Sequence, residues 1–293
     1  MEELARSDLA AECGAIRDTK GVSVQSAESG GCEILRVQIR SPEAAARIGK
    51  PEGRYVTLDC GDITALDGRE SDRVKCALAV EIRDMAERMC ARRVGQSFSL
   101  LVVGLGNAEI TPDAIGPQAV RHLSVTRHLR RADRALFSTM GLCEISALAP
   151  GVLGQTGLEA AEVVKGAAAA SHPDLVIAID ALAARSLSRL AGTVQLSDAG
   201  ICPGSGVGNR RWALNKESIG VPVMALGVPT VVDSATLALD ALKQAGYESL
   251  SAELRGELLA WQRFAVAPKE IDLLVTSAAV LLAEAIEKAF SID

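Results

Sequence analysis

Two aspartates stand where runs of apolar residues end, a placement that suggests chemistry. Asp113 lies in TPDAIG, seven residues after Gly106 of the apolar stretch SLLVVGLG. Asp180 interrupts a second apolar run, DLVIAIDAL. An ionised carboxylate inside such a run is costly unless it is paired or functional. Two acids at the carboxyl ends of different parallel strands meet at one edge of a sheet. There, one carboxylate can activate a water molecule while the other, protonated, protonates a leaving group.

Asp113 also has a structural interpretation. In TPD, Thr111 would cap a helix, Pro112 would take the first helical position, and Asp113 would favour the positive end of the helix dipole. For Asp113 alone this is the simpler interpretation. The two interpretations are compatible, because a turn that starts a helix can also aim Asp113 toward Asp180.

Other common catalytic motifs are missing from the sequence. Gly104 and Gly106 do not complete a dinucleotide fingerprint, because Glu109 occupies the third glycine position. The patterns GxxxxGK[ST], HExxH and GxSxG do not occur. The seven cysteines contain no C-x-x-C pair and indicate reduced thiols. We therefore expect a site that uses neither a cofactor nor a metal ion.

Four further charged residues are secondary candidates. Asp198 and Asp233 each end a strand-like run and are possible supporting acids, although a helix cap or a structural hydrogen bond explains each more simply. Arg210 and Arg211 end the glycine-rich stretch PGSGVGNRR. They are candidates for binding an acidic substrate residue, with a solvated pair as the alternative.

The elements that must position these residues alternate between strands and helices. Strands are predicted at 32–40, 54–60, 99–106, 174–182, 193–198 and 222–228, and helices at 71–93, 117–131, 157–171, 233–246 and 269–289. This alternation predicts an α/β fold with a mostly parallel, twisted sheet flanked by helices. Ligands bind such sheets beyond the carboxyl ends of the strands. Residues 1–31 are polar and are predicted to form an extension outside the core.

Composition agrees with this fold class and excludes several functions. The chain has 293 residues, of which 48% are hydrophobic and only 3% aromatic, so an Ala, Val, Leu and Ile core is expected, as in a sheet buried on both faces. The net charge of -6 argues against general affinity for nucleic acid. No secretory signal and no run of ~20 apolar residues is present, which predicts a cytoplasmic protein without a membrane span.

Longer motifs carry a resemblance to a known family. Eight stretches follow one another in the order RYVTL (54–58), LVVGLGN…TPDAIGPQAV (101–120), TRHL (126–129), PGVLGQTGLE (150–159), HPDLVIAIDALAARS (172–186), SDAGICPGSGVGNRR (197–211), GVPVMALGVPTVVD (220–233) and APKEID (267–272). Together they resemble the germination proteases of spore-forming bacteria, endopeptidases that degrade small acid-soluble spore proteins. The resemblance covers most of the chain from about residue 54 to 285.

The resemblance implies an atypical aspartic peptidase whose α/β fold is similar to the hydrogenase-maturation endopeptidases (phosphorylase/hydrolase-like). The two essential aspartates of the family fall on Asp113, in PDAIG, and Asp180, in AIDALAAR. The resemblance also implies a homotetramer, a location in the spore core or forespore, and small acid-soluble spore proteins as substrates. The family commonly carries a longer insertion before APKEID than this chain has.

The family is made as a zymogen that trims its own N-terminus. Its substrates are cut after an acidic residue and before an apolar residue and Ala, with Glu two positions further on. The stretch ARSDLAAE (5–12) fits this pattern, with cleavage between Asp8 and Leu9. Residues 1–8 would then be a propeptide, and residues 9–293 a single α/β peptidase domain. Without the resemblance, the stretch is an unremarkable polar tail.

Two other functions stay open at this stage. One is a metal-dependent maturation peptidase or peptidyl-tRNA hydrolase on a similar fold. The other is a catalytically silent protein that binds spore proteins. The sequence does not assign the base and the acid within the carboxylate pair, since such a pair titrates as a unit.

Overall fold

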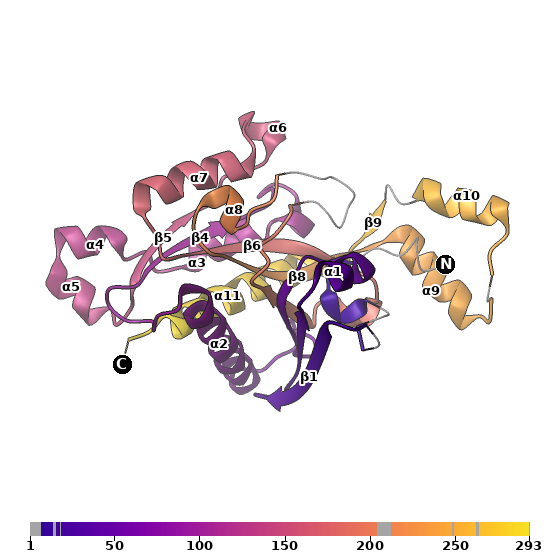
Figure 1. Ribbon diagram of the computed structural model, residues 1–293, viewed down its shortest axis with the longest axis horizontal. Helices are drawn as coiled ribbons and strands as arrows, with labels where there is room; N and C mark the ends of the chain where they lie inside the picture. The colour runs from indigo at the N-terminus through magenta and orange to yellow at the C-terminus, as the bar shows by residue number, and fades with distance from the viewer. Residues whose placement is uncertain are drawn as a thin grey trace.

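A mixed sheet forms the centre of the protein (Figure 1). The computed structural model describes residues 7–13, 16–17, 19–203, 212–247, 249–261 and 264–292. Within these residues the strand order is β1-β2-β3-β7-β8-β6-β4-β5, with β9 paired to β8. The strands are β1 (Val22–Ser29), β2 (Cys32–Ile39), β3 (Gly53–Asp59), β4 (Ser99–Gly104), β5 (Glu144–Leu148), β6 (Leu175–Ala184), β7 (Thr193–Ser197), β8 (Val223–Asp233) and β9 (Ala265–Val266).

Helices cover both faces of the sheet, which confirms the α/β class. One face packs against α2 (Gly68–Cys90), α3 (Ile115–His122) and α11 (Ile271–Ala289), the other against α7 (Ala160–Ser171) and α8 (Lys216–Ile219). The other helices are α1 (Pro42–Ile48), α4 (Arg127–Ala132), α5 (Arg134–Thr139), α6 (Leu153–Thr156), α9 (Ser234–Gln244) and α10 (Ala252–Trp261), and the 3₁₀ turns are η2 (Ala10–Glu12), η3 (Thr111–Asp113) and η4 (Leu187–Arg189). No helix within the described ranges is long and apolar enough to cross a membrane.

The prediction of a mostly parallel sheet holds only for one end of it, from β8 to the edge strand β5. Strands β8, β6, β4 and β5 are parallel, as expected when helices connect them. Strands β7, β3, β2 and β1 continue the sheet with antiparallel pairs. A tight turn at Gly30 and Gly31, both at positive φ, joins β1 to β2 as a hairpin. The sheet is therefore mixed.

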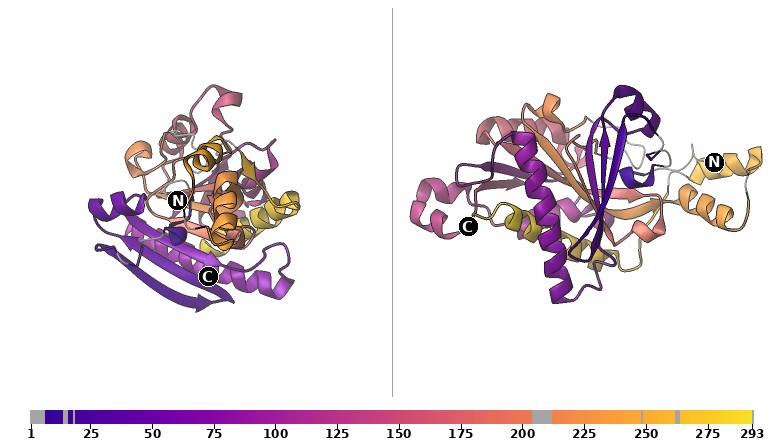
Figure 2. Two further views of the ribbon diagram at one scale, coloured as in Figure 1. Left: turned by 90° about the vertical axis from the view of Figure 1, so that its right-hand side faces the viewer. Right: turned by 60° about the horizontal axis from the view of Figure 1, so that its bottom comes forward.

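Strand β1 corrects the expectation that residues 1–31 lie outside the folded body. It pairs along its whole length with β2, and Figure 2 shows the two strands side by side at the edge of the sheet. Most of its side chains are exposed, so its sequence lacks the apolar alternation of a half-buried strand. Main-chain pairing, which leaves no hydrophobic pattern, holds this edge strand in place.

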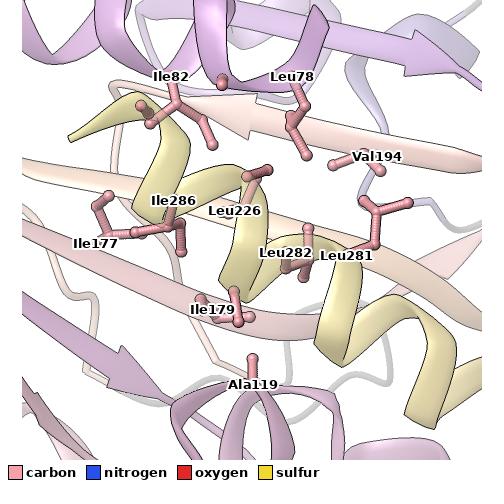
Figure 3. Packing of buried hydrophobic residues seen from close by; sticks show 14 of the residues in the cluster. Leu78, Ile82, Ala119, Ile177, Ile179, Val194, Leu226, Leu281, Leu282 and Ile286 are labelled. Atoms are coloured by element: carbon pink, nitrogen blue, oxygen red, sulfur yellow. The ribbon is translucent and has the colours of Figure 1, made fainter. Parts of the chain in front are cut away.

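Alternating residues of the central strands face the two helical layers. On β6, Ile177 and Ile179 face the core under α2 and α11, where they pack near Leu282 and Ile286 (Figure 3). Ala178, between them, faces the layer of α7. Because side chains alternate along a strand, Asp180 continues the α7 face.

The chain after β4 turns sharply to bring η3 and α3 against the sheet. A Cβ atom on Gly104 would lie 2.1 Å from the main-chain oxygen of Gly116, so the start of α3 touches the end of β4. The predicted helix cap at Thr111 is wrong. Thr111 begins the separate 3₁₀ turn η3, whose N-cap residue Ile110 makes no side-chain cap, and α3 begins only at Ile115.

Candidate active site

The structure places Asp113 and Asp180 on the wall of one cavity of about 930 Å³. Asp113 ends η3, and η3 contacts β6 and β8. The Asp113 Oδ2 atom accepts a hydrogen bond from Asn107 N at 2.7 Å, and Asp180 Oδ1 accepts one from Ala181 N at 2.9 Å. Asp180 is only 6% exposed. The turn after one strand and the body of the next thus bring two carboxyl groups to a shared cavity.

The register of the sheet places Gln195 on the opposite side of the cavity floor from Asp180. Gly227 of β8 pairs with Asp180 of β6 on one side and with Gln195 of β7 on the other. Neighbouring strands lie about 4.8 Å apart, so the backbones of Asp180 and Gln195 are separated by about 10 Å. A Cβ atom on Gly227 would approach Asp180 O to 2.6 Å and Leu182 Cγ to 2.7 Å. Glycine keeps this floor open.

The N-terminal segment enters the same cavity, which Asp8 lines. Asp8 N donates to Ala183 O at 2.8 Å, and Ala183 N donates to Asp8 Oδ2 at 2.9 Å. Gln195 Nε2 donates to Asp8 O at 3.1 Å, while Gln195 Oε1 accepts from Ala10 N at 2.7 Å. The Asp8–Leu9 peptide bond, at which cleavage is predicted, is therefore held at the cavity that Asp113 and Asp180 line.

The four secondary candidates differ in where they lie relative to the cavity. Asp198 lines the cavity and accepts a hydrogen bond from Arg54 N at 2.6 Å, and burial raises its pKa against the opposing effect of Arg54. Asp233 is not among the residues that line the cavity. It caps α9 by accepting from Thr236 N at 2.9 Å, the structural alternative considered for it. Arg210 and Arg211 lie outside the described residues.

Comparison with known proteins decides the family. The model of the family described as germination protease matches residues 2–255. The chain belongs to the germination protease family. Its relatives in this family include the germination protease of Caldanaerobacter subterraneus subsp. tengcongensis, 40% identical with 97% of this chain and 93% of the relative covered. The germination proteases of Bacillus subtilis (44% identical, 81% and 66% covered) and Clostridium acetobutylicum (38%, 91% and 81%) are also similar.

Membership of the germination protease family makes the chain a peptidase. Among solved structures, the [NiFe] hydrogenase maturation protease HycI from Thermococcus kodakarensis matches 64% of this chain and 92% of its own. The identity is 19% and the TM-score 0.35, a likeness too weak to support an argument about function.

Sequence reasoning missed three cavity residues of this chain. Gln195 is 7% exposed, on the opposite side of β7 from the core residues Val194 and Leu196. Its position between two apolar residues of TVQLSD was the available signal. Lys50 donates from Nζ to Ser7 O at 2.9 Å. Thr230 is buried in the bulge of β8, and its hydroxyl has no hydrogen-bond partner within the described part of the chain.

The seven cysteines of the chain are free thiols. Burial raises the pKa of the Cys143 thiol to about 12 and that of Cys90 to about 11. Such thiols stay protonated near neutral pH and are poor nucleophiles. The cavity is lined by only one cysteine among the described residues, Cys202.

Proposed function

We propose that this chain is an endopeptidase made as a self-processing zymogen, which initiates the degradation of small acid-soluble spore proteins during germination. The observation that carries the proposal is the position of the Asp8–Leu9 bond in the cavity lined by Asp113 and Asp180. Relatives named germination protease, at 38–46% identity, support the same function. Residues 1–8 would be the propeptide, and residues 9–293 a single peptidase domain.

In the proposed reaction, the two aspartates share the work of peptide hydrolysis. One carboxylate takes a proton from a water molecule, whose oxygen attacks the carbonyl carbon of Asp8. The other, protonated carboxyl group gives its proton to the nitrogen of Leu9 as the carbon–nitrogen bond breaks. The products are a new carboxylate on Asp8 and a new amino group on Leu9. Neither step requires a metal ion.

The two aspartates have different surroundings, but the proposal leaves their roles interchangeable. Asp180 is buried on a strand, and Asp113 lies on the 3₁₀ turn, where a main-chain N–H binds it. Carboxyl groups that share a proton titrate together, so acid and base are properties of the pair.

The family resemblance is also the reason to expect a homotetramer located in the spore core or forespore.

Replacement of either aspartate tests the chemistry. Asp113→Asn and Asp180→Asn keep the size of each side chain and remove its ability to transfer a proton. Loss of general acid or base catalysis lowers rates by about 10²–10⁴-fold. We therefore expect each variant to lose at least 100-fold in the rate of cleavage of an acid-soluble spore protein, measured by gel and mass spectrometry.

The control is Asp272→Asn, a change of the same kind in the exposed first turn of α11. It should retain wild-type activity. Near wild-type activity in Asp113→Asn or Asp180→Asn would overturn the assignment. Activity abolished by a chelator and restored by a divalent metal would instead indicate a metal-dependent hydrolase. Stable capture of the spore protein without cleavage by the wild-type chain would indicate a binding protein.

A further inference from the structure

Residues 7–12 are held in the cavity region by contacts that include four main-chain groups of Ser7, Asp8 and Ala10. Lys50 binds the carbonyl of Ser7, Ala183 binds the N–H of Asp8, and Gln195 binds both the carbonyl of Asp8 and the N–H of Ala10. Contacts to main-chain groups do not depend on the side chains of the bound segment. A groove that makes them can bind other peptides in the same conformation, extended at Leu9 and then turned as in η2 (Ala10–Glu12).

Two consecutive side chains of this segment fill closed pockets. Leu9 is 0% exposed and packs against Leu182, Ala184 and Val232. Ala10 is also 0% exposed and lies in a second apolar cluster. That cluster includes the residues Val37, Ile39, Ala44, Ile48 and Tyr55. The first pocket holds a large apolar side chain, whereas the second holds a small one. Ala11, by contrast, is half-buried.

Glu12, the last residue of the bound segment 7–12, accepts a pair of charge-assisted hydrogen bonds. Its Oε2 and Oε1 atoms accept from Arg185 N at 2.7 Å and from Ser186 N at 2.8 Å. Both donors lie directly after β6, the strand that carries Asp180. Two convergent main-chain N–H groups recognise a carboxylate at a fixed distance from the bond held by Gln195.

We propose that this groove is the substrate-binding site of the peptidase, and that the chain's own residues 8–12 occupy it as a substrate does. This inference rests on the proposed function and adds the residues that select the substrate. Gln195 holds the carbonyl of the bond to be cleaved. The pockets of Leu9 and Ala10 select a large and then a small apolar residue. The N–H groups of Arg185 and Ser186 select a glutamate four residues after the acidic one.

Gln195 then has a role in the chemistry itself. The oxygen that accepts from its Nε2 atom becomes negatively charged when water attacks the Asp8 carbonyl carbon. Loss of one such donor costs about 10²–10³-fold in kcat. Gln195→Leu should lower the kcat for a peptide substrate by about 100-fold, with a smaller change in KM.

Four synthetic peptides test the groove. The parent peptide copies residues 4–13, with serine in place of Cys13. Three variants replace the residue that corresponds to Glu12 by Gln, Ala10 by Leu, or Ala11 by Leu. The last is the matched control. With the full-length Glu12→Gln chain as enzyme, the Gln and Ala10→Leu peptides should lose about tenfold or more in kcat/KM, and the Ala11→Leu peptide less than threefold.

The same glutamate change should act in opposite directions in the enzyme and in the peptide. In the full-length chain, Glu12→Gln loosens the occupying segment, so the parent peptide should bind more tightly than it does to wild type. Glu28→Gln, on exposed β1, is the control and should leave peptide binding unchanged. The inference would be overturned if all four peptides bound equally well. It would also be overturned if the Glu12→Gln chain bound the parent peptide no more tightly than the wild-type chain does.

Failure of the proposed function gives a different result. If no peptide is cleaved, fluorescence anisotropy on the full-length Asp180→Asn, Glu12→Gln chain still measures the order of peptide affinities. The predicted order of affinities without cleavage would support the groove as a peptide-binding site and contradict the peptidase mechanism. Cleavage of all four peptides at equal rates would support the peptidase mechanism and contradict the groove as the site that selects the substrate.

Discussion

Asp198 shows how burial changes a carboxyl group beside the cavity. Its pKa is raised by removal from solvent, and the hydrogen bond and charge of Arg54 only partly offset this effect. The folded protein therefore binds a proton at Asp198 more tightly than the unfolded chain does. Stability linked to this group is greatest at low pH and falls as the pH rises through the raised value.

Asp198→Asn removes this pH dependence. The Asn Oδ1 atom can still accept from Arg54 N, and the neutral side chain has no charge to bury. We expect the free energy of unfolding of Asp198→Asn, relative to its parent, to improve between pH 4 and pH 7. Urea denaturation of both chains in the Asp180→Asn background measures this without self-cleavage. A relative stability that moves in favour of the parent as the pH rises would contradict the argument.

Single residues were predictable where the sequence pattern implies a free-energy cost of burying a charged side chain. Asp180 interrupts an apolar run, and the cost of a carboxylate there is enough to mark it as a candidate. Asp233 stands in a comparable place at the end of a strand but caps α9, so the strand-end position alone does not identify a cavity residue. Gln195 carried only a weak signal, because a polar residue between two apolar ones is ordinary in a strand.

At the scale of elements, the contact between β4 and α3 decides where Asp113 lies. The backbones of Gly104 and Gly116 are in contact. Gly106 has φ +105°, and a Cβ atom on it would lie 2.0 Å from Asp113 O. A side chain at Gly104 would push α3 and the adjoining η3 away from the sheet. This close approach connects the fold to the position of the candidate carboxylate.

Gly104→Ala should therefore destabilise the protein. The added methyl group would lie 2.1 Å from Gly116 O, and overpacking of this kind costs about 1–3 kcal/mol or more. Gly166→Ala is the matched control within α7, where a Cβ meets no atom within 4 Å. It should stabilise by about 0.5–1 kcal/mol, the helix preference of alanine over glycine. Urea denaturation compares the two, and equal effects would refute the close-contact account.

The elements with strong periodicity were predictable, and those defined by distant contacts were not. The predicted helix at 269–289 and the strand at 193–198 match α11 and β7 closely. The predicted helix at 117–131 is instead broken into α3 and α4. At the break, Thr126 Oγ1 donates to Cys143 O at 2.6 Å and accepts from Ile145 N at 2.9 Å. These bonds to Cys143, beside β5, and to Ile145, within it, compete with continuation of the helix. The strand β5 was itself not predicted from the sequence.

At the scale of the whole molecule, the antiparallel part of the sheet encloses the N-terminal segment. Strands β2 and β3 and helix α1 supply the cluster around Ala10, while β6 and β7 supply Ala183 and Gln195. Ala10 and Gln195 are separated by 185 positions in the chain. No local pattern predicts such a contact, which is why the residues of this segment resemble a polar tail unless the family's cleavage pattern is considered.

We propose that this chain cleaves itself between Asp8 and Leu9 with Asp113 and Asp180. Mass spectrometry of the purified full-length protein, held at mildly acidic pH, tests it directly. The wild-type chain should lose residues 1–8 and gain an N-terminus at Leu9, whereas Asp113→Asn and Asp180→Asn should remain intact. A wild-type chain that stays whole, or a Leu9 terminus that forms at the same rate in either variant, would contradict self-cleavage by the two aspartates.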